Sequence, residues 1–350
     1  MTKQLWFVKS RMERNQKCIL SQVIMGSQQV SIIAVNADDI ASYNQAKYLL
    51  EKFPWQLIGK IEGKMAYQLN DVRIWIFERG ILFEDDIDQR WFDNTGEVVV
   101  EVIFPSRHAA ASGKPSLTLH PIGVPQLNKA EKPPFGGKAG FAPPPSTRLS
   151  SWWKMLQEYV SGTELAEQFE LTLEVTHHGP WLNVPAMFIE IGSTEKTWPN
   201  EEAAELLARI IADGMALDGK NNIGLWDENA NSGDLVLVTL GGGHYAPRAN
   251  KLASMDGVWL GHMLATYALP FEKPEDETEQ PGGTWKQALE SAIAATRQAF
   301  PKGQIICSMD KKAFRGWQRQ AIRDYLSVVE VPLLTTKQIV EVLGNKTQAS

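Results

Sequence analysis

Short apolar segments of strand length alternate with longer amphipathic segments through most of this 350-residue chain, and this pattern strongly limits the possible folds. Residues 98–104 are almost wholly apolar, as expected for a strand that is covered on both faces. Further strands are predicted at residues 30–35, 73–77, 170–175, 185–191, 234–240 and 304–309. Helices are predicted at residues 40–53, 146–159, 201–215, 285–300, 311–328 and 336–343. This alternation predicts an α/β fold with a mostly parallel sheet flanked by helices.

Composition divides the chain into three predicted parts. Residues 1–29 carry five basic side chains against one acidic side chain, and we interpret them as a poorly ordered extension. Residues 30–160 are predicted to form a smaller N-terminal α/β lobe, and residues 161–350 a C-terminal α/β lobe. Pro, Gly and Lys gather in residues 121–148, which predicts a long loop at the end of the first lobe.

Charge and cysteine content exclude some classes of function. The 35 basic and 41 acidic side chains give a net charge of −6, which excludes a uniformly basic nucleic-acid-binding coat but allows a local basic patch. The two cysteines are too few for a four-thiolate zinc site and fit a reducing compartment. No apolar run reaches the roughly 18 residues of a membrane span. We therefore expect a cytoplasmic protein with no membrane partner.

Five of the six histidines lie in short polar motifs next to predicted strands. They are His108, His120, His177, His178 and His244. Side chains at strand ends of an α/β protein converge on one crevice, so we expect these imidazoles to meet in one pocket. Imidazole binds metal ions and moves protons near neutral pH. The sixth, His262, lies in apolar sequence and is interpreted as a structural residue.

A zinc site is one interpretation of this histidine set. Catalytic zinc takes histidine and carboxylate ligands and keeps one position open. Glu174 and Glu190 lie on predicted strands beside the histidines and are the carboxylates expected near such a metal. Adjacent residues of a strand point to opposite faces, so His177 and His178 are expected to have different roles.

The triple glycine before His244 fits either an anion site or a tight turn with unusual backbone dihedrals. Glycine lets backbone N–H groups approach an anion closely, so Gly242 and Gly243 are candidates to hold an oxyanion or a phosphate. Arg248 follows, and its guanidinium can bind phosphate or carboxylate in a bidentate way. No Gly-x-Ser-x-Gly elbow occurs, which argues against a serine esterase.

The C-terminal part contains a regular series of basic residues. Lys311, Arg315, Arg319 and Arg323 recur at every fourth position, with Lys312 adjacent. On one helix they form a basic ridge, which serves either solubility or the binding of a phosphate backbone.

The histidine motifs, taken in this order, resemble the archaeal and plant type (type 2) of D-aminoacyl-tRNA deacylase. The matching stretches are residues 104–123, 174–194, 240–248, 260–269 and 310–312, within a resemblance that covers about residues 30–345. The chain differs after His120, where residues 121–124 (Pro-Ile-Gly-Val) replace the family's Thr-Thr-Gly-Asn. The resemblance implies a fold similar to phosphorylases and peptidyl-tRNA hydrolases, and zinc as cofactor. It also implies hydrolysis of the ester that links a D-amino acid to the 3′-terminal ribose of tRNA, a quality control of translation.

We therefore predict a zinc-dependent D-aminoacyl-tRNA deacylase with tRNA as its partner and no obligate protein partner. The expected metal ligands are His108, His120, His178, His244 and Glu174. The expected catalytic residues are His177, His178, His244 and Glu190. The expected substrate-binding residues are Arg107, Gly242, Gly243, Tyr245, Arg248, Lys311, Lys312 and Arg315.

Two other functions fit parts of the sequence. A phosphorylase or nucleosidase acting on a small nucleoside would use the glycine loop to hold phosphate. A non-catalytic tRNA-binding protein would account for the sequence change after His120.

Overall fold

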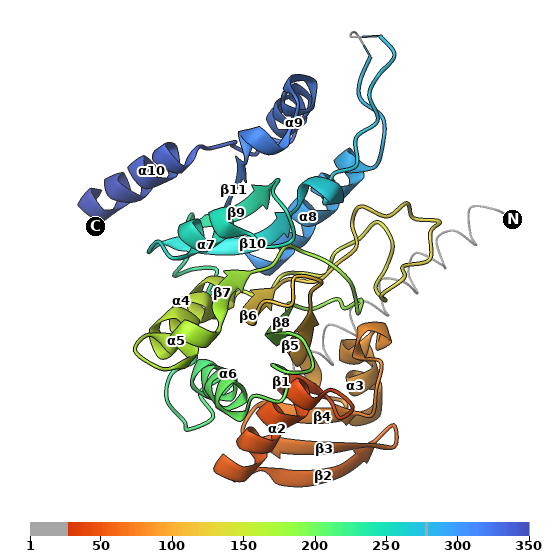
Figure 1. Cartoon of the computed structure of the whole chain (residues 1–350), viewed down its shortest axis with the longest axis vertical. Coiled ribbons are helices and arrows are strands. Elements are labelled where there is room, and N and C mark those ends of the chain that lie inside the picture. Colours follow the sequence, from red (N-terminus) through yellow and green to blue (C-terminus); the bar gives the residue numbers. More distant parts are fainter. Residues whose placement is uncertain (1–26, 277–278, 350) are drawn as a thin grey trace, which may run out of the picture.

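The computed structural model of the chain describes residues 27–276 and 279–349, which form two β-sheets with flanking helices (Figure 1). The predicted N-terminal extension lies outside the described residues except for residues 27–29, and the first strand begins at Gln29. Among the described residues, none of the helices combines the length and the apolar composition that crossing a bilayer requires.

The larger sheet has eight strands in the order β2-β3-β4-β1-β5-β8-β6-β7. Its strands are β1 (Gln29–Asn36), β2 (Gln56–Ile61), β3 (Lys64–Leu69), β4 (Val72–Phe77), β5 (Val98–Ala109), β6 (Ser116–His120), β7 (Glu170–Leu173) and β8 (Ala186–Ser193). Strands β2, β3 and β4 form an antiparallel meander, and β6 runs antiparallel to β8. The other neighbouring strands are parallel.

The smaller sheet is wholly parallel, with strand order β10-β9-β11. Its strands are β9 (Leu235–Leu240), β10 (Val258–Leu264) and β11 (Gln304–Met309). The α-helices of the fold are α2 (Ile40–Lys52), α3 (Ile87–Thr95), α4 (Leu149–Val160), α5 (Leu165–Gln168), α6 (Glu201–Gly214), α7 (Pro247–Ala253), α8 (Trp285–Ala299), α9 (Gly316–Val328) and α10 (Thr336–Ala349). Short 3₁₀ helices are η1 (Ile81–Phe83), η2 (Thr266–Ala268) and η3 (Lys311–Ala313).

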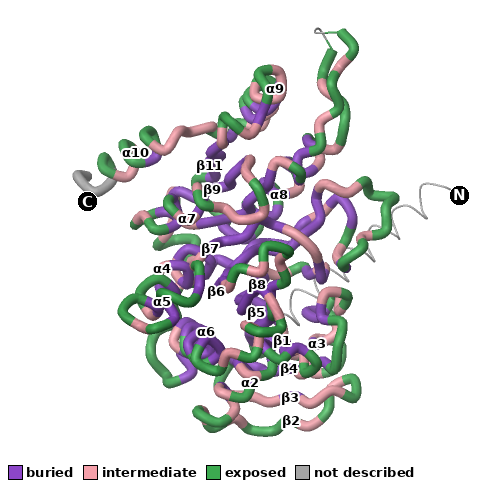
Figure 2. The backbone as a smooth tube through the Cα atoms, viewed as in Figure 1, coloured by how far each residue is buried: buried purple, intermediate pink, exposed green. Residues whose placement is uncertain are grey.

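Strand β1 shows how the core is built. Successive side chains of a strand point to opposite faces of the sheet. Ile33 and Val35 pack in the core shared with α2, α4 and α6, whereas Ile32 and Ala34 pack on the other face with Trp91 of α3. The sheet is therefore covered on both faces, and its central strands are buried in Figure 2.

The predicted mostly parallel α/β architecture is confirmed, but some details of the prediction are wrong. Strands β5 and β6 are consecutive in the chain but are not neighbours, because β8 lies between them in the sheet. The predicted helix 311–328 is divided, because η3 ends at Ala313 and α9 begins at Gly316. The predicted lobe boundary at residue 160 falls within the large sheet, since β7 and β8 come from beyond it. Residues 121–148 form a long irregular segment, as predicted.

A buried ion pair fixes the end of this segment. The Arg148 guanidinium donates from Nε to Glu101 Oε2 at 2.7 Å and from Nη1 to the carbonyl oxygens of Gly214 and Ile223. The Ser146 hydroxyl donates to the other Glu101 carboxylate oxygen at 2.6 Å. Arg148 and Glu101 are 1% and 3% exposed, so water does not solvate either charge. Each charge is therefore stabilised mainly by the other.

We expect Glu101→Gln to lower the free energy of unfolding by about 3–5 kcal/mol, because it leaves the buried Arg148 charge without its counter-ion. The control is Glu228→Gln, which breaks the exposed pair with Lys302 and is expected to cost less than about 1 kcal/mol. Urea titrations of both variants measure the difference. Equal midpoints for the two variants would show that the buried pair is not a major source of stability.

Candidate active site

All six histidines lie in the described part of the chain. The imidazole rings of five of them gather where the two sheets meet. His108 is near the end of β5, His120 ends β6, and His177 and His178 follow β7. The ring centroids of His120 and His177 are 4.1 Å apart, and those of His177 and His244 are 4.6 Å apart. The predicted convergence of these five histidines is therefore present in the structure.

Backbone pairing brings the loop after β9 to the end of β7. The N–H of Val175 donates to the carbonyl of His244, and the N–H of Ala246 donates to the carbonyl of Leu173. Glu174 and Tyr245 form the antiparallel bridge between these two bonds. The loop of the small sheet thus extends β7 of the large sheet and holds His244 over the carboxylate of Glu174.

Glu174 is the centre of the cluster. Its Oε2 atom lies 2.8 Å from His244 Nε2, 3.2 Å from His108 Nδ1 and 3.7 Å from His177 Nε2. Burial alone would raise the pKa of this carboxyl, but the hydrogen bonds from His108 and His244 outweigh burial and hold the pKa well below its usual range. For the two imidazoles, burial opposes protonation, yet their contacts with Glu174 raise both pKa values. Glu174 is therefore a buried carboxylate that organises two imidazoles.

Three other imidazoles present free ring nitrogens. The Nδ1 atoms of His120, His177 and His178 lie 3.1, 2.7 and 2.7 Å from the carbonyl oxygens of Pro121, Val175 and Gly179. A carbonyl oxygen only accepts, so each Nδ1 carries the proton and each Nε2 keeps its lone pair. Burial lowers the pKa of His120 to about 4 and that of His178 to about 3, and it lowers the pKa of His177 well below its usual value. All three imidazoles are neutral near pH 7.

Glu190 on β8 has its pKa shifted in the opposite direction to that of Glu174. Its Oε2 atom lies 3.5 Å from His120 Nε2 and 3.7 Å from His108 Nδ1. Burial, reinforced by the negative charge of Glu174, raises the pKa of Glu190 well above its usual range. Two carboxyl groups whose surroundings drive their pKa values apart are typical of catalytic sites.

The donor chemistry fits a zinc ion. One ligand atom from each of His120, His177 and His178 lies within 4.8 Å of the others, and the same holds for His108, Glu174 and His244. His120 Nε2 and Glu174 Oε1 are buried without a hydrogen-bond partner, which is unfavourable unless another group satisfies them. Neutral imidazoles whose Nδ1–H groups are held by carbonyls are the usual histidine ligands of zinc.

The prediction that His177 and His178 point to opposite faces is wrong. Strand β7 ends at Leu173, so the alternation of a strand does not apply to these residues. His178 has a left-handed φ of 41°, which turns its ring toward that of His177, with centroids 4.3 Å apart. Both rings therefore belong to one cluster, and His177 joins the possible metal ligands.

The Pro-Ile-Gly-Val stretch that departs from the family pattern supports the paired histidines. The Gly123 N–H donates to the carbonyl oxygens of His177 and His178 at 3.2 and 2.8 Å. Gly123 has a φ of 142°, and a Cβ atom there would lie 2.5 Å from the Cβ of Ala142. A glycine is needed at this close approach of two backbone segments.

The predicted anion site at the triple glycine is only partly available. The Gly242 N–H donates to the hydroxyl of Thr266 at 3.1 Å, so this group already has a partner inside the protein. Gly243 is exposed beside His244. The fixed bond to Thr266 holds the loop at the end of β10 rather than leaving it to wrap around an anion.

Two predicted substrate-binding residues have different surroundings. Tyr245 lies in the cluster, with its hydroxyl 3.4 Å from His108 Nε2. Arg107 leaves β5 on the face opposite to His108, and its guanidinium lies over the ring of Trp198 at 4.6 Å. The prediction that Arg107 binds substrate at the cluster is therefore not supported by its position.

The basic series is not one ridge. Lys311 belongs to η3 and Arg315 precedes α9, so the four-residue spacing does not place them on one helix with Arg323. Arg319 donates to the carbonyl oxygens of Lys311 and Phe314 and closes this turn. Lys311 and Lys312 line a cavity together with Arg248, whereas Arg315 is not among its lining residues.

Some residues of the site carry no sequence motif. The Tyr267 hydroxyl lies 3.3 Å from His244 Nδ1, and the Asp39 carboxylate accepts from the backbone N–H of Arg107 at 2.8 Å. Tyr267 follows β10, and Asp39 follows β1, so their position after parallel strands is the signal that could have identified them. The predicted structural role of His262 fits its buried contacts with Thr176 and the Pro143 carbonyl.

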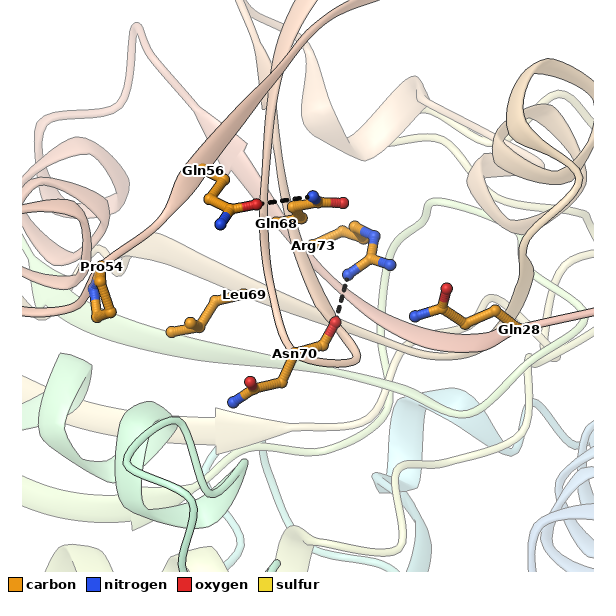
Figure 3. A pocket seen from close by; sticks show the side chains of 7 residues that line it. All are labelled: Gln28, Pro54, Gln56, Gln68, Leu69, Asn70 and Arg73. Atoms are coloured by element: carbon orange, nitrogen blue, oxygen red, sulfur yellow. Dashed lines mark hydrogen bonds between the residues drawn. The ribbon is translucent and has the colours of Figure 1, made fainter.

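A separate hollow of about 330 Å³ lies beside the β3–β4 turn, lined by polar side chains that include Gln56, Gln68 and Asn70 (Figure 3). Arg73 also lines it, but its guanidinium is bound to Glu97 at 2.6 Å and to backbone carbonyls. Among the described residues, the hollow thus offers no charged group that is available for catalysis, whereas the histidine cluster does.

Known proteins share the sequence and fold of this chain. A family model described as D-aminoacyl-tRNA deacylase matches residues 95–334. A D-aminoacyl-tRNA deacylase of Arabidopsis thaliana is 42% identical over 304 residues, which cover 85% of this chain and 96% of the relative. That of Methanosarcina barkeri is 30% identical over 324 residues, covering 89% and 92%. A crystal structure of a conserved protein of unknown function has the same fold, with a TM-score of 0.70, 24% identity and coverage of 89% of this chain and 96% of that chain. This chain belongs to the D-aminoacyl-tRNA deacylase family.

Proposed function

We propose that this chain hydrolyses the ester between a D-amino acid and the 3′-terminal ribose of tRNA at the histidine–glutamate cluster. Family membership supports the reaction and the tRNA substrate. The observation that carries the site assignment is the buried Glu174 carboxylate, which contacts imidazoles from three separate segments of the chain. Such a preorganised charge is suited to stabilise the charge changes of acyl transfer.

We further propose that zinc binds here, held by the Nε2 atoms of His120, His177 and His178. The support is their neutral state, their fixed Nδ1–H groups and the buried, unpartnered His120 Nε2. The group formed by His108, Glu174 and His244 is the second possible ligand set. When bound, zinc supplies Lewis acidity that polarises the ester carbonyl.

We assign the proton transfers to His244 and the residues around it. Its Nε2–H donates to Glu174, which leaves Nδ1, beside the Tyr267 hydroxyl, to accept the proton of the attacking water. The Glu174 carboxylate stabilises the imidazolium that forms, and the imidazolium then returns its proton to the leaving ribose oxygen. The Glu190 carboxyl, which lies within 3.7 Å of His108 and His120, positions these two imidazoles.

The test is incubation with D- and L-tyrosyl-tRNA, with and without a chelator, combined with a metal analysis of the protein. We expect hydrolysis of the D-ester, much slower hydrolysis of the L-ester, bound zinc in the protein, and loss of both zinc and activity after chelation. Full activity in protein shown to be free of metal would contradict the zinc assignment.

The same assay separates the two other functions. Release of a free base from nucleosides, with no action on charged tRNA, would indicate a phosphorylase or nucleosidase. Salt-sensitive tRNA binding without turnover would indicate a non-catalytic tRNA-binding protein. Because charged tRNA is the proposed substrate, we also propose that the protein acts in the cytoplasm.

A further inference from the structure

A cavity of about 700 Å³ opens at the carboxyl end of the small sheet. Its lining comes from α7, from the turn after β11, from α9, and from the segment that leads into α10. The lining residues are Arg248, Met309, Asp310, Lys311, Lys312, Arg323, Leu333, Leu334, Thr335, Thr336, Lys337 and Gln338. The carboxyl ends of parallel strands are where α/β folds bind ligands.

The cavity is strongly basic although the whole chain carries a charge of −6. Five of its lining residues are cations, and one, Asp310, is an acid. The Asp310 carboxylate accepts from the Lys312 backbone N–H at 3.0 Å, where it caps η3. The surplus of positive charge therefore faces the cavity and favours an anionic ligand.

Few carboxylates of the protein neutralise these cationic side chains. Within the described residues, no ion pair joins a carboxylate to Arg248, Lys311, Lys312 or Arg323. Arg248 donates from Nη2 to the Ser308 hydroxyl at 2.8 Å, which fixes the guanidinium, while its Nε is buried without a partner. Lys337 is 3.8 Å from Glu341, but both side chains are solvent-exposed. A fixed, unpaired guanidinium with nearby ammonium groups is suited to phosphate.

One short segment joins the cavity to the histidine cluster. His244 contacts Glu174, and Arg248, four residues later, lines the cavity, so their Cα atoms are at most about 14 Å apart. The loop also approaches the cavity wall, since a Cβ atom on Gly241 would lie 3.4 Å from the Cβ of Asp310, which lines the cavity. A strand of RNA whose end lies at the cluster can place an earlier phosphate in the cavity.

We propose that this cavity binds backbone phosphates of the single-stranded 3′ end of tRNA and so positions the aminoacyl ester at the histidine cluster. This inference rests on the proposed function and names the part of the substrate that is held outside the reaction centre. Met309, Leu333 and Leu334 supply an apolar wall for sugar or base, beside the cationic groups. Phosphate contacts of this kind fix register and orientation without reading sequence.

The test measures binding of uncharged tRNA, so it needs no turnover and stays readable if the deacylase assignment fails. We expect the double variant Lys312→Ala/Arg323→Ala to bind at least about 10-fold more weakly. The slope of log affinity against log salt should also fall by about 1.4, at about 0.7 per phosphate contact of a single strand. The matched control is Lys47→Ala/Lys52→Ala, which removes two exposed positive charges from α2, a helix that contributes no residue to the cavity lining, and should keep the native affinity and slope.

A second arm locates the contact on the RNA. Native protein should lose affinity when tRNA is trimmed of its single-stranded 3′ end, whereas the Lys312→Ala/Arg323→Ala variant should bind intact and trimmed tRNA nearly equally. If the two substitutions weakened the binding of intact and of trimmed tRNA by the same factor relative to native protein, the contact would lie on the stem and the proposal would be overturned. So would native tRNA binding by the variant combined with loss of inorganic phosphate binding, which would assign the cavity to free phosphate.

Discussion

Replacing His178 or His244 by Ala is expected to remove D-aminoacyl-tRNA hydrolysis while the protein stays folded. His244 is the proposed proton acceptor, and loss of such a group lowers the turnover rate by about 10²- to 10⁴-fold. His178 contributes one of three neutral imidazoles with a free Nε2, so its loss is expected to lower zinc content and turnover together. Initial rates with D-tyrosyl-tRNA, together with metal analysis, measure both effects.

The folding control for these variants is thermal unfolding followed by circular dichroism. His262→Ala is unsuitable as a matched control, because His262 is fully buried and bonded to Thr176 and the Pro143 carbonyl. Wild-type-like turnover by both His178→Ala and His244→Ala would exclude the roles assigned to these residues.

Glu174→Gln is expected to lower turnover by at least about 100-fold with little change in KM. The amide has nearly the shape of the carboxylate but lacks the charge that orients and stabilises the imidazolium of His244. Glu170→Gln is the matched control, since Glu170 is exposed at the start of the same strand, β7. Steady-state kinetics of the two variants give the comparison, and a Glu174→Gln enzyme with native kcat would show that this carboxylate is not part of the chemistry.

Much of this architecture could be predicted from residue patterns. Strand β5 contains a nearly continuous apolar run, and helix α6 has acids in its first turn, and these patterns predict both elements. The strands β2, β3, β6 and β10 are not among the predicted elements. Strand β2 is largely exposed and contains Gly59 rather than a regular apolar alternation. Such strands form because they pair with neighbouring strands, and the local sequence does not encode this pairing.

The candidate site could be predicted as a set of residue types but not as a geometry. Histidine and glutamate beside predicted strands indicated which side chains would meet. The choice of Glu174 as the shared carboxylate depends on the backbone pairing of Val175 with His244, a contact across 69 positions. The opposite pKa shifts of Glu174 and Glu190 follow from burial and from distances between segments remote in sequence. The bond from Gly242 to Thr266 could not be foreseen, because Thr266 lies in a segment 24 positions away.

The most direct test of the cluster as the reaction centre is single-turnover hydrolysis of D-tyrosyl-tRNA at saturating enzyme, which separates the chemical step from tRNA binding. The native protein and Glu170→Gln are predicted to release D-tyrosine at the same rate. His178→Ala, His244→Ala and Glu174→Gln are predicted to release it at least about 100-fold more slowly while still binding tRNA. Native release rates in these three variants would contradict the assignment of catalysis to the cluster.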